Sequence, residues 1–259
     1  MLKSNGKPPL IIAHRGFSAT APENSLIAFR KALEAKADGI EMDVRLTREL
    51  VPIVFHDQSL KRVASFPKPV SALSLDEIRK VNLGLWFNRR FPSKASNEFL
   101  SERIPTLEEA LILLENHDVK IYLELKASQR VDSSTTVEKV LEVISKKKIK
   151  LSQLVFKSFE EKILRVLRER LPEAKIAALF APKLGFSRKK MLSFVKQMKV
   201  DEVSIHFLLA NRKLVKEAKS EGLKVIVWTV NDPIWLQRAI ETRIDAVITN
   251  DPLKFKLMI

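Results

Sequence analysis

Nine short apolar runs recur along the chain, and they constrain its fold more than any other feature. Segments with helical periodicity separate most of them. Strands that alternate with helices predict a parallel sheet, and about eight such units predict a (β/α)8 TIM barrel. The runs are LIIAH (10–14), GIEMDVRL (39–46), VPIVFH (51–56), VKIYLELK (119–126), LVFKSF (154–159), KIAALF (175–180), EVSIHF (202–207), KVIVWTV (224–230) and DAVIT (245–249).

The second and third runs cannot be parallel neighbours in the sheet. Only TREL (47–50) separates them, whereas a parallel crossover needs about a dozen residues. They therefore predict an antiparallel hairpin, which leaves eight barrel strands and one hairpin arm. A turn at TREL predicts three opposed pairs: Leu46 with Val51, Asp43 with Val54, and Glu41 with His56.

Helices are predicted between the runs by apolar spacing and by capping boxes. Apolar residues recur on one face of residues 24–36. Thr106 with Glu109, and Ser74 with Glu77, have the spacing at which two side chains cap a helix N-terminus. Further helical stretches are predicted at residues 158–173, 211–224 and 231–244.

Residues 57–104 form the one long interruption of this alternation, and their prolines predict irregular backbone. Trp86 and Phe87 in this stretch are expected to be exposed, as a hydrophobic lip or a rim that touches a membrane. We therefore expect a single domain over residues 1–259, with an insertion at about 57–104 that covers one face of the barrel.

The composition is typical of a soluble globular protein, with 46% hydrophobic and 30% charged residues. No apolar run reaches the roughly 18 residues of a membrane span, and the first residues lack signal-peptide features, so we expect a cytoplasmic location. The absence of cysteine excludes disulfides, thiolate catalysis and sulfur-ligated zinc. The formal charge of +15 indicates an anionic partner or simply a lysine-rich surface.

Acidic side chains interrupt two of the apolar runs. Glu41 and Asp43 are two residues apart and so share one face of a strand, as do Glu124 and Lys126. Burying such charges without partners costs several kcal/mol each. A divalent cation such as Mg²⁺ or Ca²⁺, held by the oxygens of Glu41, Asp43 and Glu124, would compensate for this cost.

Histidines and fixed cations lie beside these acids. His14 ends the first run, and the hairpin is expected to return His56 to the same place. Two histidines beside a metal can act as general acid and general base. Arg15 and Lys126 are candidate contacts for a phosphate. TIM-barrel enzymes carry such groups at the C-terminal ends of their strands.

Structural roles are the alternative for the same residues. The three acids could instead form internal salt bridges with Arg45, Lys126 or Arg15, and His14 could be a buried structural histidine. The ordered combination of acids, histidines and cations favours the catalytic interpretation.

These residues belong to five short motifs that follow one another along the chain. The motifs are His14-Arg15-Gly16, Pro22-Glu23-Asn24, Glu41-Met42-Asp43, His56-Asp57 and Glu124-Leu125-Lys126. With this ordered set, the chain resembles the glycerophosphodiester phosphodiesterase family of the phosphodiesterase TIM-barrel superfamily. The resemblance extends through GLWF, IPTLEEAL, SFE, VIVWTVND and DAVITNDP, and so covers nearly the whole chain.

The resemblance implies metal-dependent hydrolysis of glycerophosphodiesters to glycerol 3-phosphate and an alcohol. It implies that Glu41, Asp43 and Glu124 bind the metal, that His14 and His56 are the acid/base pair, and that Arg15 and Lys126 contact the phosphate. The chain departs from the family at the hairpin turn, which reads TREL, and after His56-Asp57, where it reads KRVASFPKP. These departures leave the preferred alcohol open, but not the reaction.

Three further residues are candidates for the pocket. Asn24 is expected to orient a phosphate oxygen or His14, or else to cap the helix that follows. His206 is a candidate contact for the glycerol of the substrate, and Trp228 a candidate pocket wall. A core position is the alternative for both.

Other functions remain open on the sequence alone. The aromatic insertion suggests a phosphodiesterase that cleaves lysophospholipids, with peripheral membrane contact but no stable insertion. A second alternative is a non-catalytic phosphodiester-binding protein. The intact acid/base pair argues against it, because binding alone does not require that pair. A nucleic-acid partner is not expected, because no helix-turn-helix, RNP or basic-aromatic motif accompanies the positive charge. The oligomeric state is not indicated.

Overall fold

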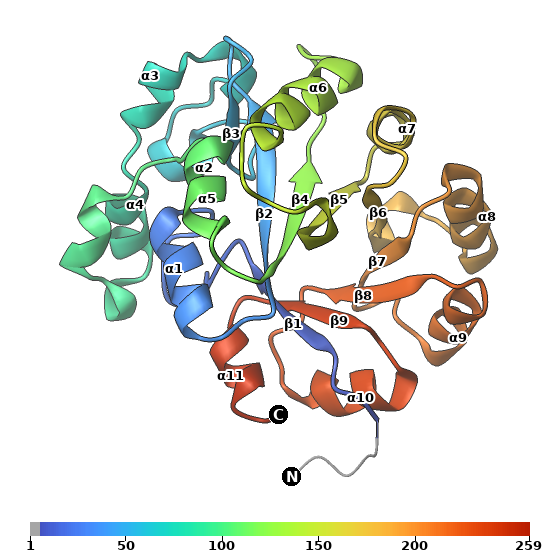
Figure 1. Cartoon of the computed structure of the whole chain (residues 1–259). Helices are drawn as coiled ribbons and strands as arrows, with labels where there is room; N and C mark the ends of the chain where they lie inside the picture. Colours follow the sequence, from blue (N-terminus) through green and yellow to red (C-terminus); the bar gives the residue numbers. More distant parts are fainter. Residues whose placement is uncertain (1–5) are drawn as a thin grey trace.

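Eight parallel strands close into a barrel in the computed structural model, which describes residues 6–259 and confirms the predicted TIM barrel (Figure 1). The strands follow one another in the order β1-β9-β8-β7-β6-β5-β4-β2, and the pairing of β1 with β2 closes the ring. Their bounds are β1 (Leu10–His14), β2 (Gly39–Leu46), β4 (Lys120–Leu125), β5 (Leu154–Ser158), β6 (Lys175–Phe180), β7 (Glu202–His206), β8 (Lys224–Trp228) and β9 (Ala246–Thr249).

Helices surround the barrel, most of them lying between consecutive strands (Figure 1). The predicted capping boxes of α5 and α3 are both present, so these two helices begin where the sequence indicates. The outer helices are α1 (Leu26–Glu34), α5 (Leu107–Leu114), α6 (Ser133–Ile144), α7 (Glu161–Arg170), α8 (Arg188–Met198), α9 (Arg212–Ser220), α10 (Ile234–Thr242) and α11 (Pro252–Lys256), with 3-10 turns η4 (Leu151–Gln153) and η5 (Pro182–Leu184).

The apolar core has two layers, because successive side chains of a strand point to opposite faces. Met42, Val44 and Leu123 point outward and pack in the large cluster between strands and helices. Ile12 and Ile226 point inward and belong to a smaller cluster that fills the barrel. Inward positions near the C-terminal strand ends are therefore free to carry polar side chains.

The hairpin arm forms as predicted, but its predicted register is wrong by one residue. Strand β3 (Pro52–Val54) pairs with β2 so that Leu46 lies opposite Pro52, and Val44 lies opposite Val54. The loop has an extra residue because Leu50 takes a left-handed conformation with φ of 63°. His56 consequently follows the end of β3 and does not pair with Glu41 in the ladder.

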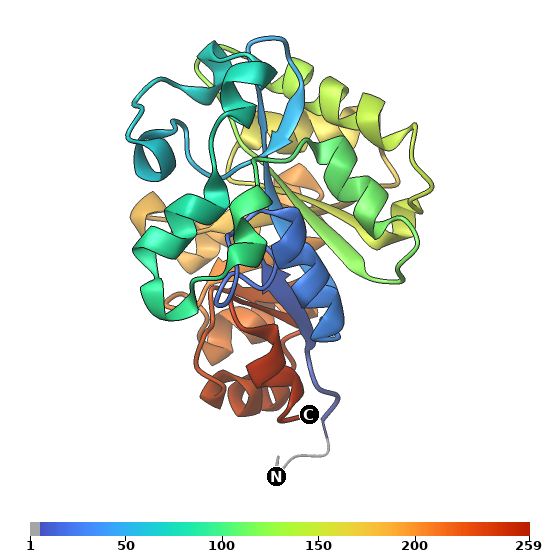
Figure 2. The ribbon, with the colours of Figure 1, turned by 90° about the vertical axis from the view of Figure 1, so that its left-hand side faces the viewer.

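Residues 57–104, here called the capping segment, lie on one side of the barrel, where α2, α3 and α4 are grouped (Figures 1 and 2). Phe87 was expected to be exposed, but only 2% of it is accessible, because it packs against Phe91 and Phe99. Trp86 is half-buried. The segment comprises α2 (Lys61–Ala64), η1 (Val70–Ala72), α3 (Leu75–Arg79), α4 (Leu83–Arg90), η2 (Pro92–Lys94) and η3 (Asn97–Ser101).

Glu202 lies at the opposite, N-terminal end of the barrel interior. It is buried, and its Oε2 has no hydrogen-bond partner among residues 6–259. Burial raises its pKa to about 7, although Lys224 Nζ lies 4.0 Å from its Oε1. This carboxyl group therefore holds a proton in the folded state at pH values where the unfolded chain has lost it.

The contribution of Glu202 to stability is expected to fall as pH rises from about 4.5 to about 7, because the folded state binds this proton more tightly than the unfolded state does. The shift corresponds to a loss on the order of 3 kcal/mol. Glu202→Gln cannot titrate, so its free energy of unfolding should exceed that of the wild type at pH 8 but not at pH 4. Urea denaturation at the two pH values measures this, and an equal difference at both would contradict it.

Candidate active site

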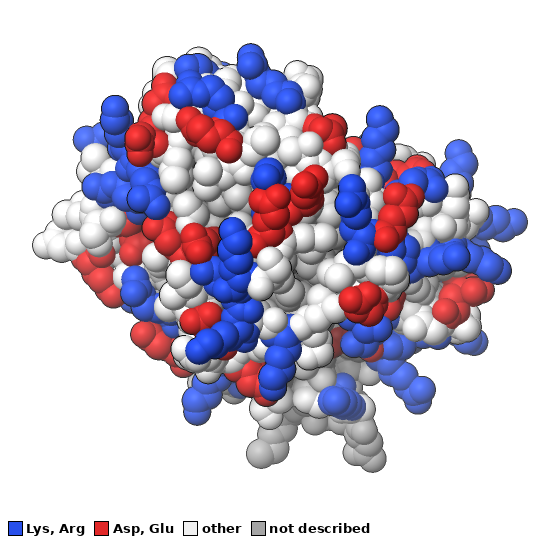
Figure 3. Space-filling view, turned by 45° about the horizontal axis from the view of Figure 1, so that its top comes forward, with Lys and Arg blue, Asp and Glu red and all other residues white. Residues whose placement is uncertain are grey.

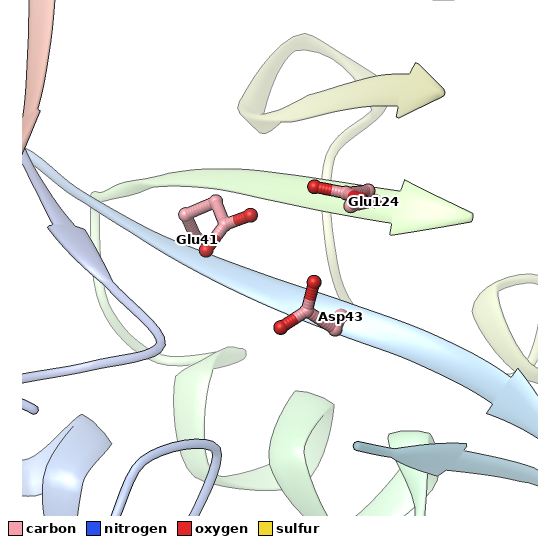
Figure 4. A group of neighbouring side chains, drawn as sticks. All are labelled: Glu41, Asp43 and Glu124. Carbon is pink, nitrogen blue, oxygen red and sulfur yellow. The ribbon is translucent and has the colours of Figure 1, made fainter. Parts of the chain in front are cut away.

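The register of neighbouring strands gathers the predicted acids at the C-terminal end of the barrel. His14 on β1 lies beside Glu41 on β2, and Asp43 on β2 lies beside Glu124 on β4. Glu124 in turn lies beside Lys157 on β5. Figure 4 shows the three carboxylates projecting toward one another from two adjacent strands.

The three carboxylates have the spacing of a metal site. Glu41, Asp43 and Glu124 are buried, and each offers one oxygen within 4.8 Å of the others. Opposite oxygens around one Ca²⁺ lie about 4.6–5.2 Å apart, since each bond is 2.3–2.6 Å long. Oxygen donors are also the ligands that Mg²⁺ and Ca²⁺ prefer. The donor set therefore fits one hard divalent cation.

Lys157 is a member of the site that sequence reasoning missed. Its side chain is 2% exposed, and its Nζ donates a hydrogen bond to Glu41 Oε1 at 2.9 Å. The same Nζ lies 3.7 Å from Glu124 Oε2. The signal in the sequence was a lysine inside the apolar run LVFKSF, because a charged side chain inside a barrel needs partners of opposite charge.

Two more cationic side chains lie beside Asp43, as expected from the alternative in which the acids form internal salt bridges. Arg15 Nε lies 3.1 Å from Asp43 Oδ2, and Lys126 Nζ lies 2.9 Å from Asp43 Oδ1. Neither contact has hydrogen-bond geometry, so Asp43 Oδ1 keeps no hydrogen-bond partner within the described chain. Lys126 also donates to Glu124. Burial raises the pKa of Asp43, but the charges of Lys126 and Arg15 oppose this effect and outweigh it. The pKa of Asp43 therefore lies well below its usual range.

Arg45 does not pair with these acids, contrary to one alternative. Its Nε donates to the backbone oxygen of His56 at 2.8 Å, and its Nη1 donates to that of Ala127 at 3.2 Å. Arg45 thus ties the backbone that carries His56 to the barrel.

Asn24 does not cap the following helix, so that alternative was wrong, and its side chain contacts Asp43 rather than His14. It is buried, and its Nδ2 donates to Asp43 Oδ2 at 2.8 Å, while its Oδ1 accepts from the backbone N of Asp43 at 3.3 Å. The cap of α1 is instead Ser25. Asn24 can take this place because its backbone is left-handed, with φ of 55°, a conformation that asparagine tolerates.

His14 presents one ring nitrogen to the acids and fixes the other. Its Nδ1 lies 2.7 Å from Asn250 Oδ1, an acceptor, so the proton is assigned to Nδ1. Its Nε2 lies 3.9 Å from Glu41 Oε2. Burial lowers the pKa of His14 below its usual value, against the opposing effect of Glu41. Asn250, which lies in the DAVITNDP stretch, was not predicted as a site residue.

The turn after His14 needs a glycine. Arg15 and Gly16 have φ of 56° and 77°, which turns the chain so that the backbone N of Arg15 donates to Glu41 Oε2 at 3.2 Å. A Cβ on Gly16 would lie 2.6 Å from the backbone carbon of Ala28. The glycine thus allows the first barrel loop to pack directly on α1.

His56 is fixed in a similar way, but by a carboxylate. Its Nδ1 donates to Asp57 Oδ1 at 2.7 Å. Asp57 Oδ2 in turn accepts from Arg62 Nε at 2.6 Å. Asp57 belongs to the His56-Asp57 motif, whereas Arg62 was not predicted as a site residue. Both histidines therefore have Nδ1 occupied and Nε2 available.

Both histidines line one cavity of about 470 Å³ at the barrel mouth, together with five other predicted residues, whereas Glu41, Asp43 and Asn24 are not part of its wall. Trp228 and His206 form part of its wall, with ring centres 5.2 Å apart, and Phe159 packs on Trp228 at 5.7 Å. The wall comprises His14, Arg15, His56, Glu124, Lys126, Lys157, Phe159, Ala181, Pro182, Lys183, His206, Leu208 and Trp228.

A second cavity of about 440 Å³ adjoins the first and shares His14 and Arg15 with it. Its outer wall comes from the capping segment, through Arg62, Trp86 and Arg90. The site therefore opens on both the barrel mouth and the capping segment.

Basic and acidic side chains are interspersed on the face shown in Figure 3, without a continuous basic stripe. This pattern is typical of a lysine-rich surface. None of the helices found between residues 6 and 259 combines the length and the apolar character needed to cross a bilayer.

Comparisons with known proteins identify the family of this chain. The family model of the glycerophosphoryl diester phosphodiesterase family matches residues 14–254. A glycerophosphodiester phosphodiesterase of Caldanaerobacter subterraneus is 32% identical over 245 residues, with 94% of each chain covered. A Bacillus subtilis glycerophosphodiester phosphodiesterase is 30% identical over 255 residues, covering 94% of this chain and 84% of the relative.

A solved structure extends the likeness to three dimensions. An Oleispira antarctica phosphodiesterase in complex with the product sn-glycerol-3-phosphate superposes with a TM-score of 0.86 and 26% identity, covering 96% of each chain. The family match spans nearly the whole barrel, including every residue of the site. The chain therefore belongs to the glycerophosphoryl diester phosphodiesterase family of phosphoric diester hydrolases.

Proposed function

We propose that this protein hydrolyses small glycerophosphodiesters, such as glycerophosphocholine or glycerophosphoethanolamine, to glycerol 3-phosphate and an alcohol, with one Mg²⁺ or Ca²⁺. The observation that carries the proposal is the cluster of three buried carboxylates, one of which, Glu124, lines the same cavity as both histidines. The relatives' names support the same substrate class.

The charges of the site suit a phosphodiester once a cation is bound. Three carboxylates, those of Glu41, Asp43 and Glu124, face three cations, Arg15, Lys126 and Lys157. Their formal charges cancel, so a divalent cation would leave the site positive. A phosphodiester carries one negative charge, and a site of opposite charge favours its binding.

Each residue then has a role in the reaction. A divalent cation held by Glu41, Asp43 and Glu124 would supply Lewis-acid chemistry at the phosphoryl group. Arg15 and Lys126 stabilise the negative charge that develops on the phosphoryl group. One histidine Nε2 accepts the proton of the attacking hydroxyl, and the other donates a proton to the leaving alcohol. His206, Phe159 and Trp228 form a wall for the glycerol.

Two nucleophiles are compatible with this arrangement. Water would give glycerol 3-phosphate directly, whereas the glycerol's own hydroxyl would first give a cyclic phosphate. Phosphorus NMR during turnover tests for the second route, because only that route can give the signal of a cyclic diester before glycerol 3-phosphate.

The proposal is tested by incubating the purified protein with glycerophosphocholine and glycerophosphoethanolamine in Mg²⁺ or Ca²⁺. We expect release of glycerol 3-phosphate over many turnovers, its loss in EDTA, and its recovery when the cation is restored. Binding without turnover would favour a non-catalytic role, and full activity in EDTA would remove the metal from the mechanism.

Cleavage of lysophospholipids is the second candidate within the same reaction class. The capping segment has a groove of about 800 Å³ in which Phe66 and Leu85 are 45% and 38% exposed beside Trp86. These side chains would suit an acyl chain or a membrane surface. Comparing rates on glycerophosphocholine and lysophosphatidylcholine separates the two candidates, and we expect faster hydrolysis of glycerophosphocholine.

A further inference from the structure

Arg62 of the capping segment links two parts of the active site that are separate in the sequence. Its Nη2 donates to Glu23 Oε1 at 2.6 Å, and its Nε donates to Asp57 Oδ2 at 2.6 Å. Glu23 Oε1 also accepts from Arg15 Nη1 at 2.9 Å, and Asp57 Oδ1 accepts from His56 at 2.7 Å. One guanidinium thus joins the carboxylates that hold a phosphate-contact arginine and a histidine.

Other contacts fix the guanidinium itself. It lies 5.0 Å from the ring centre of Trp86 on α4, within the range of a cation–π contact. Glu23 and Asp57 are only 21% and 24% exposed, so their charges are less screened than those of surface pairs. The capping segment therefore contributes both the arginine and the aromatic surface that supports it.

The geometry of a guanidinium matters for this link. Its planar fork can donate to two carboxylates at once, whereas a lysine ammonium is a single point charge on a flexible chain. Holding Asp57 Oδ2 leaves Oδ1 to accept from His56 Nδ1, which presents Nε2 to the cavity. Burial raises the pKa of Asp57, but hydrogen bonds from His56 and Arg62 oppose this effect and outweigh it. The pKa of Asp57 is therefore below its usual value, and Asp57 stays ionised.

We propose that Arg62 is a positioning residue, which holds His56 through Asp57 and Arg15 through Glu23 and so makes the capping segment part of the catalytic machinery. This inference rests on the proposed function, since it assigns His56 and Arg15 their roles. It adds one requirement to these roles: α2, the helix that carries Arg62, must be correctly placed for catalysis.

Arg62→Met tests the proposal, because methionine keeps an apolar stem and removes every donor. We expect kcat on glycerophosphocholine to fall by about 10- to 100-fold, the range found when a partner that orients a metal-binding side chain is removed, with a smaller change in KM. Arg62→Lys should recover part of kcat. The matched control is Arg165→Met, which breaks the exposed pair with Glu161 at 2.6 Å on α7 and should leave kcat unchanged.

A readout without substrate separates this proposal from the proposed function. Nitrogen-15 NMR of the four histidines, recorded at a pH where free histidine is neutral and with His56→Gln for assignment, should show the His56 proton on Nδ1 in the wild type and a mixture of tautomers in Arg62→Met. If the wild type cleaves no glycerophosphodiester, the proposed function fails, and these spectra still decide the role of Arg62.

Unchanged kcat and unchanged His56 signals in Arg62→Met would overturn the proposal. If that variant does not fold, Arg62→Lys decides. Wild-type kcat and spectra in the lysine variant would show that the fork is not needed.

Discussion

Glu41→Gln is expected to lower kcat/KM for glycerophosphocholine by about 1000-fold, the scale on which single electrostatic groups act in active sites. Glu41 is fully buried and accepts hydrogen bonds from Lys157 and from the backbone N of Arg15. Glutamine keeps the shape but removes one of three negative charges around the proposed metal. Lys157 is left with Glu124 at 3.7 Å, so the free energy of unfolding should fall by about 3 kcal/mol.

A second buried glutamate of the same barrel provides the control. Glu202→Gln changes an inward-facing carboxylate at the opposite end of the barrel, and its kcat/KM should stay within about 2-fold of the wild type. Metal binding gives a readout other than activity. Mg²⁺ or Ca²⁺ should raise the thermal midpoint of the wild type by mass action, and much less that of Glu41→Gln. A Glu41→Gln protein with wild-type rates and the same metal-induced shift would contradict the proposed site.

The barrel could be predicted because each strand is an apolar run, and each run is a local feature of the sequence. The hairpin followed from a distance argument, since four residues cannot span a parallel crossover. Its register could not be predicted in the same way. The left-handed Leu50 adds one residue to the loop, and a leucine gives no sign of positive φ in the sequence.

Residues of the candidate site could be predicted where they belong to short sequence motifs. They were missed where their place depends on contacts between segments that are distant in the sequence. Lys157 enters the site only because β5 pairs with β4 in a register that sets it beside Glu124. Asn24 bonds Asp43, a partner 19 residues away, whereas its neighbour Ser25 is the helix cap. Phe87 is buried by Phe99, which no periodicity in an irregular segment could indicate.

The two histidines differ in the group that fixes Nδ1, and from this difference we propose different roles for them. Asp57 is a carboxylate that accepts from His56 Nδ1, and we propose His56 as the general acid. Asn250 is a neutral amide, and the pKa of His14 is lowered by burial, so His14 is suited to be the general base. His14→Ala and His56→Ala should each lower kcat on glycerophosphocholine by about 100- to 10,000-fold.

Leaving-group chemistry tests this assignment, because a good leaving group departs without a proton. With the 4-nitrophenyl diester of glycerol 3-phosphate, His56→Ala should recover to within about 10-fold of the wild type, whereas His14→Ala should stay impaired, since the attacking hydroxyl still needs a base. His117→Ala, on the loop after α5 and outside the cavity, is the matched control and should behave as the wild type on both substrates. Recovery of His14→Ala in place of His56→Ala would reverse the two roles, and recovery of neither would mean that proton donation does not limit the reaction.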